Sequence, residues 1–311
     1  MKNTTFYKFD IMPDQELRLD QLISLQLPEY SRSRIKNWIN QEKILVNGEK
    51  CAPKDKVLIK SSIQVEVNDA EELDIQAENL SLNIVYEDTE LIIINKDENI
   101  VTHTAAGNYS GTIQNGLLFK YPELRNVPRS GIIHRLDKQT SGLLIISRNL
   151  RSHNNLSKQI QERLVEKKYD AIVSGVIDNI DIIDEKIGRH KINRKKMSVT
   201  DSGKKALSKV KIKERYKKAT LIEVELVTGR THQIRVHLSY KGYPIIGDKL
   251  YGFKKNKFSY NQDIVHFLDS YQSFALHARF LKFKHPKTNK EFKIDCLPPH
   301  SFNVIKSLVS K

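Results

Sequence analysis

The sequence has only two cysteines, no long apolar run and fewer acidic than basic residues. Cys51 and Cys296 lie far apart, so neither a disulfide framework nor a Cys-x-x-Cys metal site is indicated, which suits a reducing compartment. No apolar segment of signal-peptide length lies near the first residue, and no run reaches the roughly 18 apolar residues of a membrane helix. We therefore expect a cytoplasmic protein with no membrane partner.

The shortage of acids leaves a large positive charge. The 311-residue chain carries 52 Lys and Arg against 37 Asp and Glu, a formal net charge of +15. This excess indicates a polyanionic partner, and the lack of a membrane segment favours nucleic acid over an anionic membrane surface. Composition alone leaves open the alternative of a merely soluble basic protein. The length allows two domains, and 39% apolar residues can form a sizeable core.

Apolar patterns divide the chain into a small and a large part. Residues 1–15 are interpreted as an N-terminal arm or short strand. Residues 16–67 combine two short helices, the second capped by Ser31, with the strands "ILVNGEK" and "SIQVEV". Residues 68–81 hold five acids and no Lys or Arg, and are interpreted as a linker. Residues 82–311 alternate strand and helix patterns with few long helices, which favours an α+β fold.

The second short helix, "YSRSRIKNWINQEK", is basic on one side. Its apolar positions are expected to face a core, and its exposed face then carries Arg32, Arg34 and Lys36. A solvated helix face is the alternative. The segment resembles the S4 domain, a small αL-type RNA-binding fold, and departs from it at Glu42, where Gly is preferred, and at Ser61–Ser62. The resemblance implies RNA contact by these three basic residues.

The stretch "SGIIHRLDKQTSGLLIISRN", residues 130–149, places charge between apolar runs. Ile132–Ile133 and Leu143–Ile146 are each predicted to be strands buried on both faces. Charged groups between buried strands cost free energy unless they are paired. Arg135 and Asp137 project to the same side of an extended chain, so Asp137 is a candidate reactive acid. A buried ion pair that only fixes a loop is the alternative.

Other chemistries need groups that the pattern does not supply. A glycosidase would need a second carboxylate nearby, and a metal hydrolase would need more ligands. His134, His232 and His237 could in principle surround zinc, but no HExxH or Cys/His spacing accompanies them. We therefore expect no metal.

"HRLDKQTSGLL" resembles the central motif of the RluA-type pseudouridine synthases. Five further segments have counterparts in that family in the same order: "GNYSGTIQNGLL", "EKKYDAIVSG", "LVTGRTHQIRVHL", "YPIIGDKLYG" and "FALHARFLKFKHP". The resemblance spans residues 82–299 and implies a catalytic core of mixed, mainly antiparallel sheet with flanking helices, behind the S4-like domain. One departure is Asp97-Glu98-Asn99, where the family has Pro-x-Gly; it is expected to alter a loop near the site and its RNA contact.

The family resemblance also implies an activity. Its members break the N1–C1′ bond of a uridine, turn the uracil and rejoin it through C5, with no cofactor or metal. Asp137 corresponds to the catalytic residue, acting as nucleophile or as base. Arg235 corresponds to the group that pairs with it and favours its ionised form. Tyr169 corresponds to the ring that stacks on uracil, and Arg135 to the side chain that fills the space of the everted nucleotide.

The members most similar to this chain act on 23S ribosomal RNA of the large subunit, in the helix 69 stem-loop. Two alternatives remain: action on other uridines of the same RNA, or a non-catalytic RNA-binding protein of ribosome assembly. The basic tract 186–197, with Arg194, Lys195 and Lys196, has no apolar stripe and is predicted to be a flexible hairpin that grips phosphates, together with Lys204–Lys205. A solvated loop is the alternative for this tract. We expect a monomer.

Overall fold

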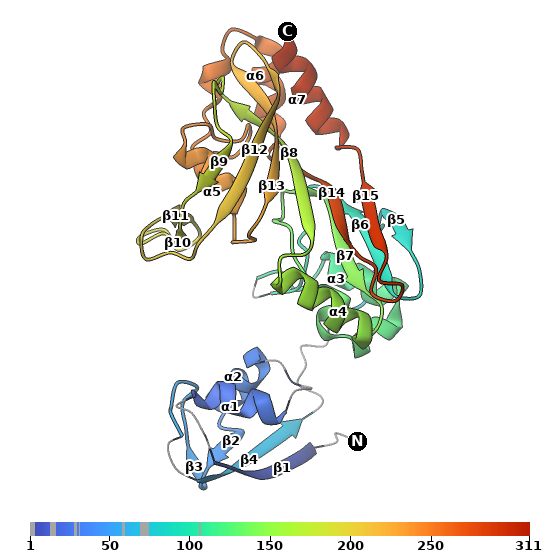
Figure 1. The fold of residues 1–311 in the computed structure, drawn as a ribbon, viewed down its shortest axis with the longest axis vertical. Helices are drawn as coiled ribbons and strands as arrows, with labels where there is room; N and C mark the ends of the chain where they lie inside the picture. Colours follow the sequence, from blue (N-terminus) through green and yellow to red (C-terminus); the bar gives the residue numbers. More distant parts are fainter. Residues whose placement is uncertain are drawn as a thin grey trace. The chain divides into compact units, whose positions relative to one another are not determined.

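The computed structural model describes residues 4–12, 17–27, 30, 32–57, 60–68, 75–105 and 107–311. Side chains are described for all of these except Thr4, Ser33, Arg34, Val67 and Asn68. The predicted Ser31 cap and the Arg34 side chain therefore lie outside the described residues. The chain divides into two compact units, residues 1–74 and residues 75–311 (Figure 1).

The first unit is a four-stranded sheet with two helices. Its elements are β1 (Thr4–Ile11), α1 (Leu19–Gln26), α2 (Arg32–Asn40), β2 (Ile44–Val46), β3 (Glu49–Lys50) and β4 (Ser61–Asn68). The strand order is β1-β4-β2-β3, and β1 pairs with β4 along its whole length. Residues 4–11 are therefore a strand of this sheet and not a separate arm. Apolar residues of both helices form the core, as their spacing predicted: Leu19, Leu22, Ile23, Ile35, Trp38 and Ile39.

The turn after α2 holds a non-glycine residue in a left-handed conformation. Glu42 has φ 60°, and the next amide, that of Lys43, donates to the carbonyl of Trp38 at 2.9 Å. A side chain with a Cβ atom costs about 1–2 kcal/mol in this region of backbone space. Glycine is favoured here because it has no Cβ, which explains the preference of S4 domains for Gly at this position.

We expect Glu42→Gly to stabilise the first unit by about 1 kcal/mol, because glycine removes the left-handed strain. The ion pair of Glu42 with Lys50 is exposed and contributes little. The neighbouring Gln41→Gly is the matched control and should destabilise the unit. Urea unfolding of the full chain can be followed by the fluorescence of Trp38, since it is the sole tryptophan and lies in this core. Equal loss of stability in both variants would contradict the expectation.

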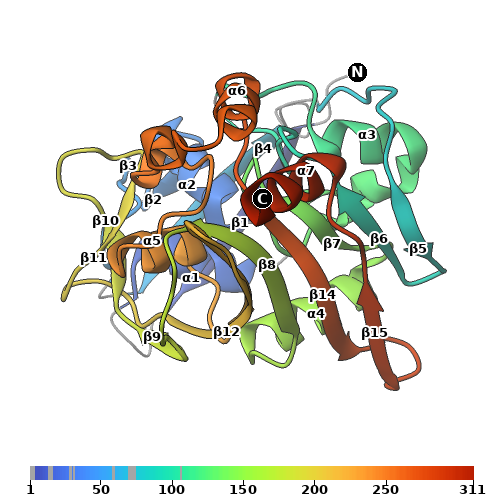
Figure 2. The same cartoon turned by 90° about the horizontal axis from the view of Figure 1, so that it is seen from above.

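The second unit is built on a nine-stranded sheet (Figures 1 and 2). Its strands are β5 (Ile84–Glu87), β6 (Leu91–Lys96), β7 (Ser141–Ser147), β8 (Glu166–Ser174), β9 (Ile182–Asp184), β12 (Leu207–Arg215), β13 (Ala219–Leu226), β14 (Leu276–Lys284) and β15 (Glu291–Asp295). The order is β5-β6-β7-β14-β8-β13-β12-β9, with β15 beside β14. All neighbours are antiparallel except β7 and β14, so the predicted mixed, mainly antiparallel sheet is confirmed.

Helices cover this sheet on both faces. They are α3 (Ile113–Lys120), α4 (Leu150–Gln161), α5 (Gln233–Tyr240), α6 (Gln262–Ser270) and α7 (His300–Ser310). Leu156 of α4 packs against Leu143 and Ile145 of β7, whereas Leu144 and Ile146 join the larger core on the other face. The prediction that β7 is buried on both faces is confirmed. No described helix is long and apolar enough to cross a membrane.

Four sequence expectations differ from the structure. Ile132–Ile133 is not a strand, because Ile132 forms only an isolated bridge with β7. The helical spacing of Leu156, Ile160 and Leu164 predicts one apolar helix face, but Leu164 is exposed, since α4 ends before it and Arg163 has φ 62°. The segment "THQIRVHLSYKG" predicts a helix capped by Thr231, but His232 occupies the N-cap of α5 in a left-handed conformation. Residues 75–81, expected to be linker, belong to the second unit, where Gln76 and Glu78 accept hydrogen bonds from Asn115 and Gly111.

The basic tract 186–197 forms a hairpin of β10 (Ile187–Arg189) and β11 (Met197–Val199). Ile187 is buried against Val236 of α5 and Tyr251. The expectation that this tract has no apolar side to bury is therefore wrong at its base. The turn of the hairpin extends away from the large sheet (Figures 1 and 2). Its basic residues are therefore carried by two strands whose base is packed against α5.

Candidate active site

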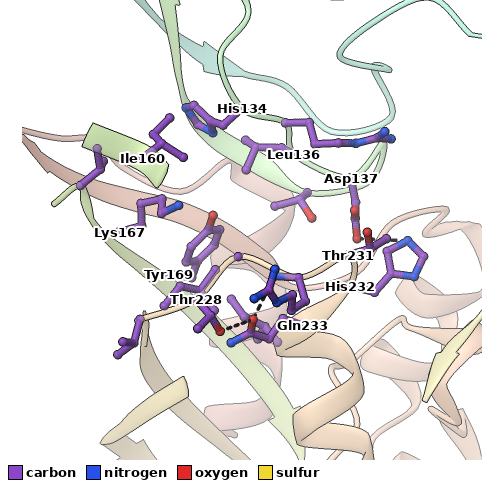
Figure 3. A pocket seen from close by; sticks show the side chains of 18 of the residues that line it. His134, Leu136, Asp137, Ile160, Lys167, Tyr169, Thr228, Thr231, His232 and Gln233 are labelled. Atoms are coloured by element: carbon purple, nitrogen blue, oxygen red, sulfur yellow. Dashed lines mark hydrogen bonds and ion pairs between the residues drawn. The ribbon is translucent and has the colours of Figure 1, made fainter. Parts of the chain in front are cut away.

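A pocket of about 510 Å³ in the second unit contains the candidate acid. Residues 133–137 and residues 226–235 form two of its walls, and β8 contributes Lys167 and Tyr169. Figure 3 shows Asp137 and Tyr169 entering the same space from different segments. The structure thus brings together groups that lie far apart in the sequence.

Asp137 is held by a buried guanidinium. Nη1 of Arg235 donates to a carboxylate oxygen of Asp137 at 2.8 Å. Nε and Nη2 of the same arginine donate to the two oxygens of Asp248, at 2.7 and 2.9 Å. The side chains of Arg235 and Asp248 are 5% and 1% exposed, whereas that of Asp137 is 20% exposed. The outer carboxylate therefore faces the pocket while the inner one fixes the arginine.

The surroundings of Arg235 keep it charged. Its guanidinium lies over the rings of Tyr251 and Phe274, 4.8 and 4.3 Å from their centroids. Burial alone would lower the pKa of Arg235, but its bonds to Asp248 and Asp137 outweigh burial and raise the pKa. Asp248 had no predicted role, although it lies in the family-like segment "YPIIGDKLYG". Its position after two buried isoleucines was the available indication.

Tyr169 lines the pocket from the middle of β8. Its side chain is almost fully buried, and its pKa is raised by burial and then by the negative charge of Asp137. The phenol therefore stays neutral at ordinary pH. An aromatic face beside a carboxylate is suited to a flat heterocycle attached to a sugar.

The loop that carries Asp137 is fixed by a buried lysine that the sequence analysis missed. Nζ of Lys96 donates to the carbonyl oxygens of Asp97, Ile100 and Lys138 at 2.7, 3.0 and 3.0 Å. Burial lowers the pKa of Lys96 to about 8. Since Lys138 follows Asp137 directly, these bonds connect the end of β6 to the candidate acid.

The departure Asp97-Glu98-Asn99 has a structural explanation. Asn99 has φ 66°, a conformation that asparagine tolerates better than most residues. The hydroxyls of Tyr271 and Ser301 donate to Glu98 at 3.0 and 2.7 Å, so this carboxylate is used within the fold. Of the two acids that replace the family pattern, only Asp97 has a solvent-exposed side chain that a bound RNA could approach.

The three histidines considered for zinc do not gather. The amide of Ile145 donates to His134. His232 hydrogen-bonds to the hydroxyl of Tyr251, and His237 to the hydroxyl of Ser208. Burial lowers the pKa of His134 to about 3 and also lowers that of His232. In the described part of the chain, no cluster of three or more His, Cys, Asp or Glu side chains could hold a metal ion.

A second pocket of about 400 Å³ adjoins the first and shares Asp137 and Arg235 with it. Its lining includes the basic residues Arg135, Lys138 and Lys249. Arg135 is exposed and lines both pockets, so it lies at the entrance and not inside the core.

The other predicted basic residues lie on surfaces. Arg32 and Lys36 are exposed on α2, but Arg32 pairs with the buried Asp20 at 2.9 Å and is partly neutralised by it. Arg194 and Lys195 are exposed in the turn of the β10–β11 hairpin, and Lys196 is half-buried. The structure does not bring these groups into the pocket.

Comparisons with known proteins agree with this architecture. A model of the family described as RNA pseudouridylate synthase matches residues 90–240, and a model of the S4 domain matches residues 17–63. The chain belongs to the RNA pseudouridylate synthase family and is an isomerase with an S4 domain in front.

Three relatives are similar over most of this chain, and each is named ribosomal large subunit pseudouridine synthase D. The protein from Pseudomonas aeruginosa is 42% identical over 94% of this chain and 92% of its own length. The protein from Haemophilus influenzae is 39% identical over 90% of this chain and 88% of its own length. The protein from Neisseria meningitidis is 41% identical over 94% of this chain and 78% of its own length. The solved structure of human RNA pseudouridylate synthase domain containing 1 shares the fold, with a TM-score of 0.57 and 23% sequence identity. The match covers 76% of this chain and 97% of the human chain.

We expect Asp248→Ala to destabilise the second unit by about 3 kcal/mol, because it removes a buried partner from a buried guanidinium. Circular dichroism during urea unfolding of the full chain would measure this loss. Glu225→Ala, which breaks the more exposed pair with Lys209, is the control and should change stability little. A similar loss in both variants would contradict the importance of the buried pair.

Proposed function

We propose that this enzyme isomerises uridines of large-subunit ribosomal RNA to pseudouridines, in the helix 69 stem-loop of 23S RNA. Three observations support this substrate: the names of relatives that align over nearly the whole chain, the S4 domain, and the formal charge of +15. The carboxylate of Asp137, which faces a pocket beside an aromatic ring, carries the proposal.

Asp137 is proposed to be the catalytic residue. It would either attack C1′ of the ribose or remove a ribose proton, and uracil leaves in both cases. The bond from Arg235 favours the ionised carboxylate and sets its direction. Because Asp248 holds the other edge of the guanidinium, Asp137 can act without releasing the arginine from the fold.

Tyr169 and Arg135 are proposed to bind the everted nucleotide. The C1′ atom of a paired uridine is hard to reach within a stacked helix, so the nucleotide must leave the stack, at a cost of about a few kcal/mol. The ring of Tyr169 would stack on the uracil, and the exposed Arg135 at the entrance would occupy the space left in the RNA.

All the proposed catalytic and uracil-binding groups come from the second unit of one chain, which supports action as a monomer. The cytosol is the proposed compartment, since ribosomal RNA is the proposed substrate. Action on other uridines of the same RNA is the nearest alternative. A non-catalytic assembly factor is disfavoured, because such a protein does not need the arrangement of Asp137, Tyr169 and Arg235.

We expect Asp137→Asn to lower pseudouridine formation in a helix 69 transcript by at least about 1,000-fold, because the amide can act neither as nucleophile nor as base. RNA affinity should stay within about threefold, and tritium release from 5-³H-uridine RNA would measure the rate. Asp97→Asn removes an exposed acid nearby and should remain active. Activity of Asp137→Asn at the wild-type level would refute the proposed role.

Phosphate contacts by the β10–β11 turn can be measured through salt. We expect Arg194→Ala with Lys195→Ala to reduce the slope of log affinity against log salt by roughly 0.7–0.9 per lost contact. Filter binding at several potassium chloride concentrations would measure the slope. Lys293→Ala, on β15 and paired with Glu291, is the control. An unchanged slope in the double variant would show that the turn does not touch RNA.

A further inference from the structure

Lys167 is a cation inside the first pocket that the proposed mechanism does not use. It lies two residues before Tyr169 on β8, so both side chains project from the same face of the strand into the pocket. Figure 3 shows its amine directed toward Tyr169. Among the residues that the structure describes, none forms a hydrogen bond or ion pair with Lys167.

The environment of Lys167 makes this isolation costly. The side chain is half-buried, and burial lowers its pKa. Its Nζ would lie 3.7 Å from a Cβ placed on Gly229, so the ammonium lies beside the pocket wall formed by the 228–230 loop. A desolvated charge without a partner is unfavourable in the free protein and is expected to gain a partner from a ligand.

The other cations of the pocket are already engaged or lie at its mouth. Arg235 is bonded to two carboxylates, and Nε of Arg230 donates to the carbonyl of Lys205. Arg135 and Arg163 are exposed at the mouth of the pocket. When a nucleotide is everted, the phosphates of the RNA backbone stay outside the pocket, so these two arginines can pair with phosphates. Lys167 is thus the available positive charge beside the ring of Tyr169.

We propose that the ammonium of Lys167 binds a carbonyl oxygen of the target uracil and stabilises the negative charge that forms when the base detaches. This inference rests on the proposed function. Residues i and i+2 of a strand, such as Lys167 and Tyr169, lie about 6.6 Å apart along it. The flexible side chain of Lys167 can therefore reach the edge of a uracil ring that stacks on Tyr169.

The charge arises in both versions of the chemistry. As the N1–C1′ bond breaks, its electron pair leaves with uracil and is shared among N1 and the two carbonyl oxygens. C5 then forms the new bond to C1′, either as the bond between C1′ and Asp137 breaks or as Asp137 returns the ribose proton that it had removed. C5 loses its proton to water, and N1 takes a proton from water. An ammonium beside the uracil oxygens interacts more strongly with this anion than with neutral uridine, and so favours bond breaking.

The test is Lys167→Met in the full-length enzyme, with the helix 69 transcript under single-turnover conditions. The expected result is a rate at saturating RNA about 100-fold lower, with RNA affinity within about threefold of the wild type. The melting temperature should be equal or higher, because the variant removes an unpartnered charge. Lys167→Gln, which keeps a polar chain, should also be slow and guards against a misfolded first variant.

Lys168→Met is the matched control. Lys168 is the next residue on β8, points to the other face and pairs with Glu166 at 3.0 Å, so its loss should leave the rate unchanged. A normal rate for Lys167→Met would overturn the inference. A lower rate that returns to the wild-type level at saturating RNA would also overturn it, and would indicate that Lys167 binds a phosphate of the RNA. An inactive wild type on this transcript would instead contradict the proposed substrate.

Discussion

The guanidinium of Arg235 lies between two carboxylates in a nearly buried site, and the geometry of the pocket depends on it. Removing three charged groups from water is costly, and the cost is offset only when each charge has a well-placed partner. Asp248 supplies a two-point contact, and the rings of Tyr251 and Phe274 cover the faces of the guanidinium. Asp137 is therefore held by a rigid cation while one side of it stays open to a ligand.

The sheet brings the parts of the site together. β8 lies between β14 and β13, so Tyr169 projects from the middle of the sheet, and β13 leads directly into the loop before α5 and Arg235. Behind the pocket lining, Lys96 donates to the carbonyl of Lys138, the residue after Asp137, and to the carbonyls of Asp97 and Ile100. Along the pocket, Asp137 is paired with Arg235, and Lys167 beside the ring of Tyr169 has no partner among the described residues. Arg135 and Arg163 are exposed at its mouth.

Sequence patterns succeeded where one local rule decided the structure. Alternating and continuous apolar runs predicted β4 and β7, and apolar spacing predicted the buried faces of α1 and α2, because burial of apolar groups dominates those segments. They failed where another contact competed: Leu164 matched the helical spacing but lies beyond the end of α4, and the tract of β10 and β11 showed no apolar stripe although Ile187 is buried at its base. Glu98 looked like an acid facing RNA, yet two hydroxyls bind it inside the fold.

The sequence by itself determined the two-part organisation, the excess of basic charge and, through motifs in a fixed order, the family and the candidates Asp137, Tyr169 and Arg235. Each of these follows from residue type and spacing along the chain. Only the tertiary structure decided that Asp248 shares the arginine, that Lys96 bonds to the backbone beside Asp137 and that Lys167 has no hydrogen-bond or ion-pair partner within the described part of the chain. These facts concern which charges meet across distant strands and how little water reaches them, and linear spacing does not encode either quantity.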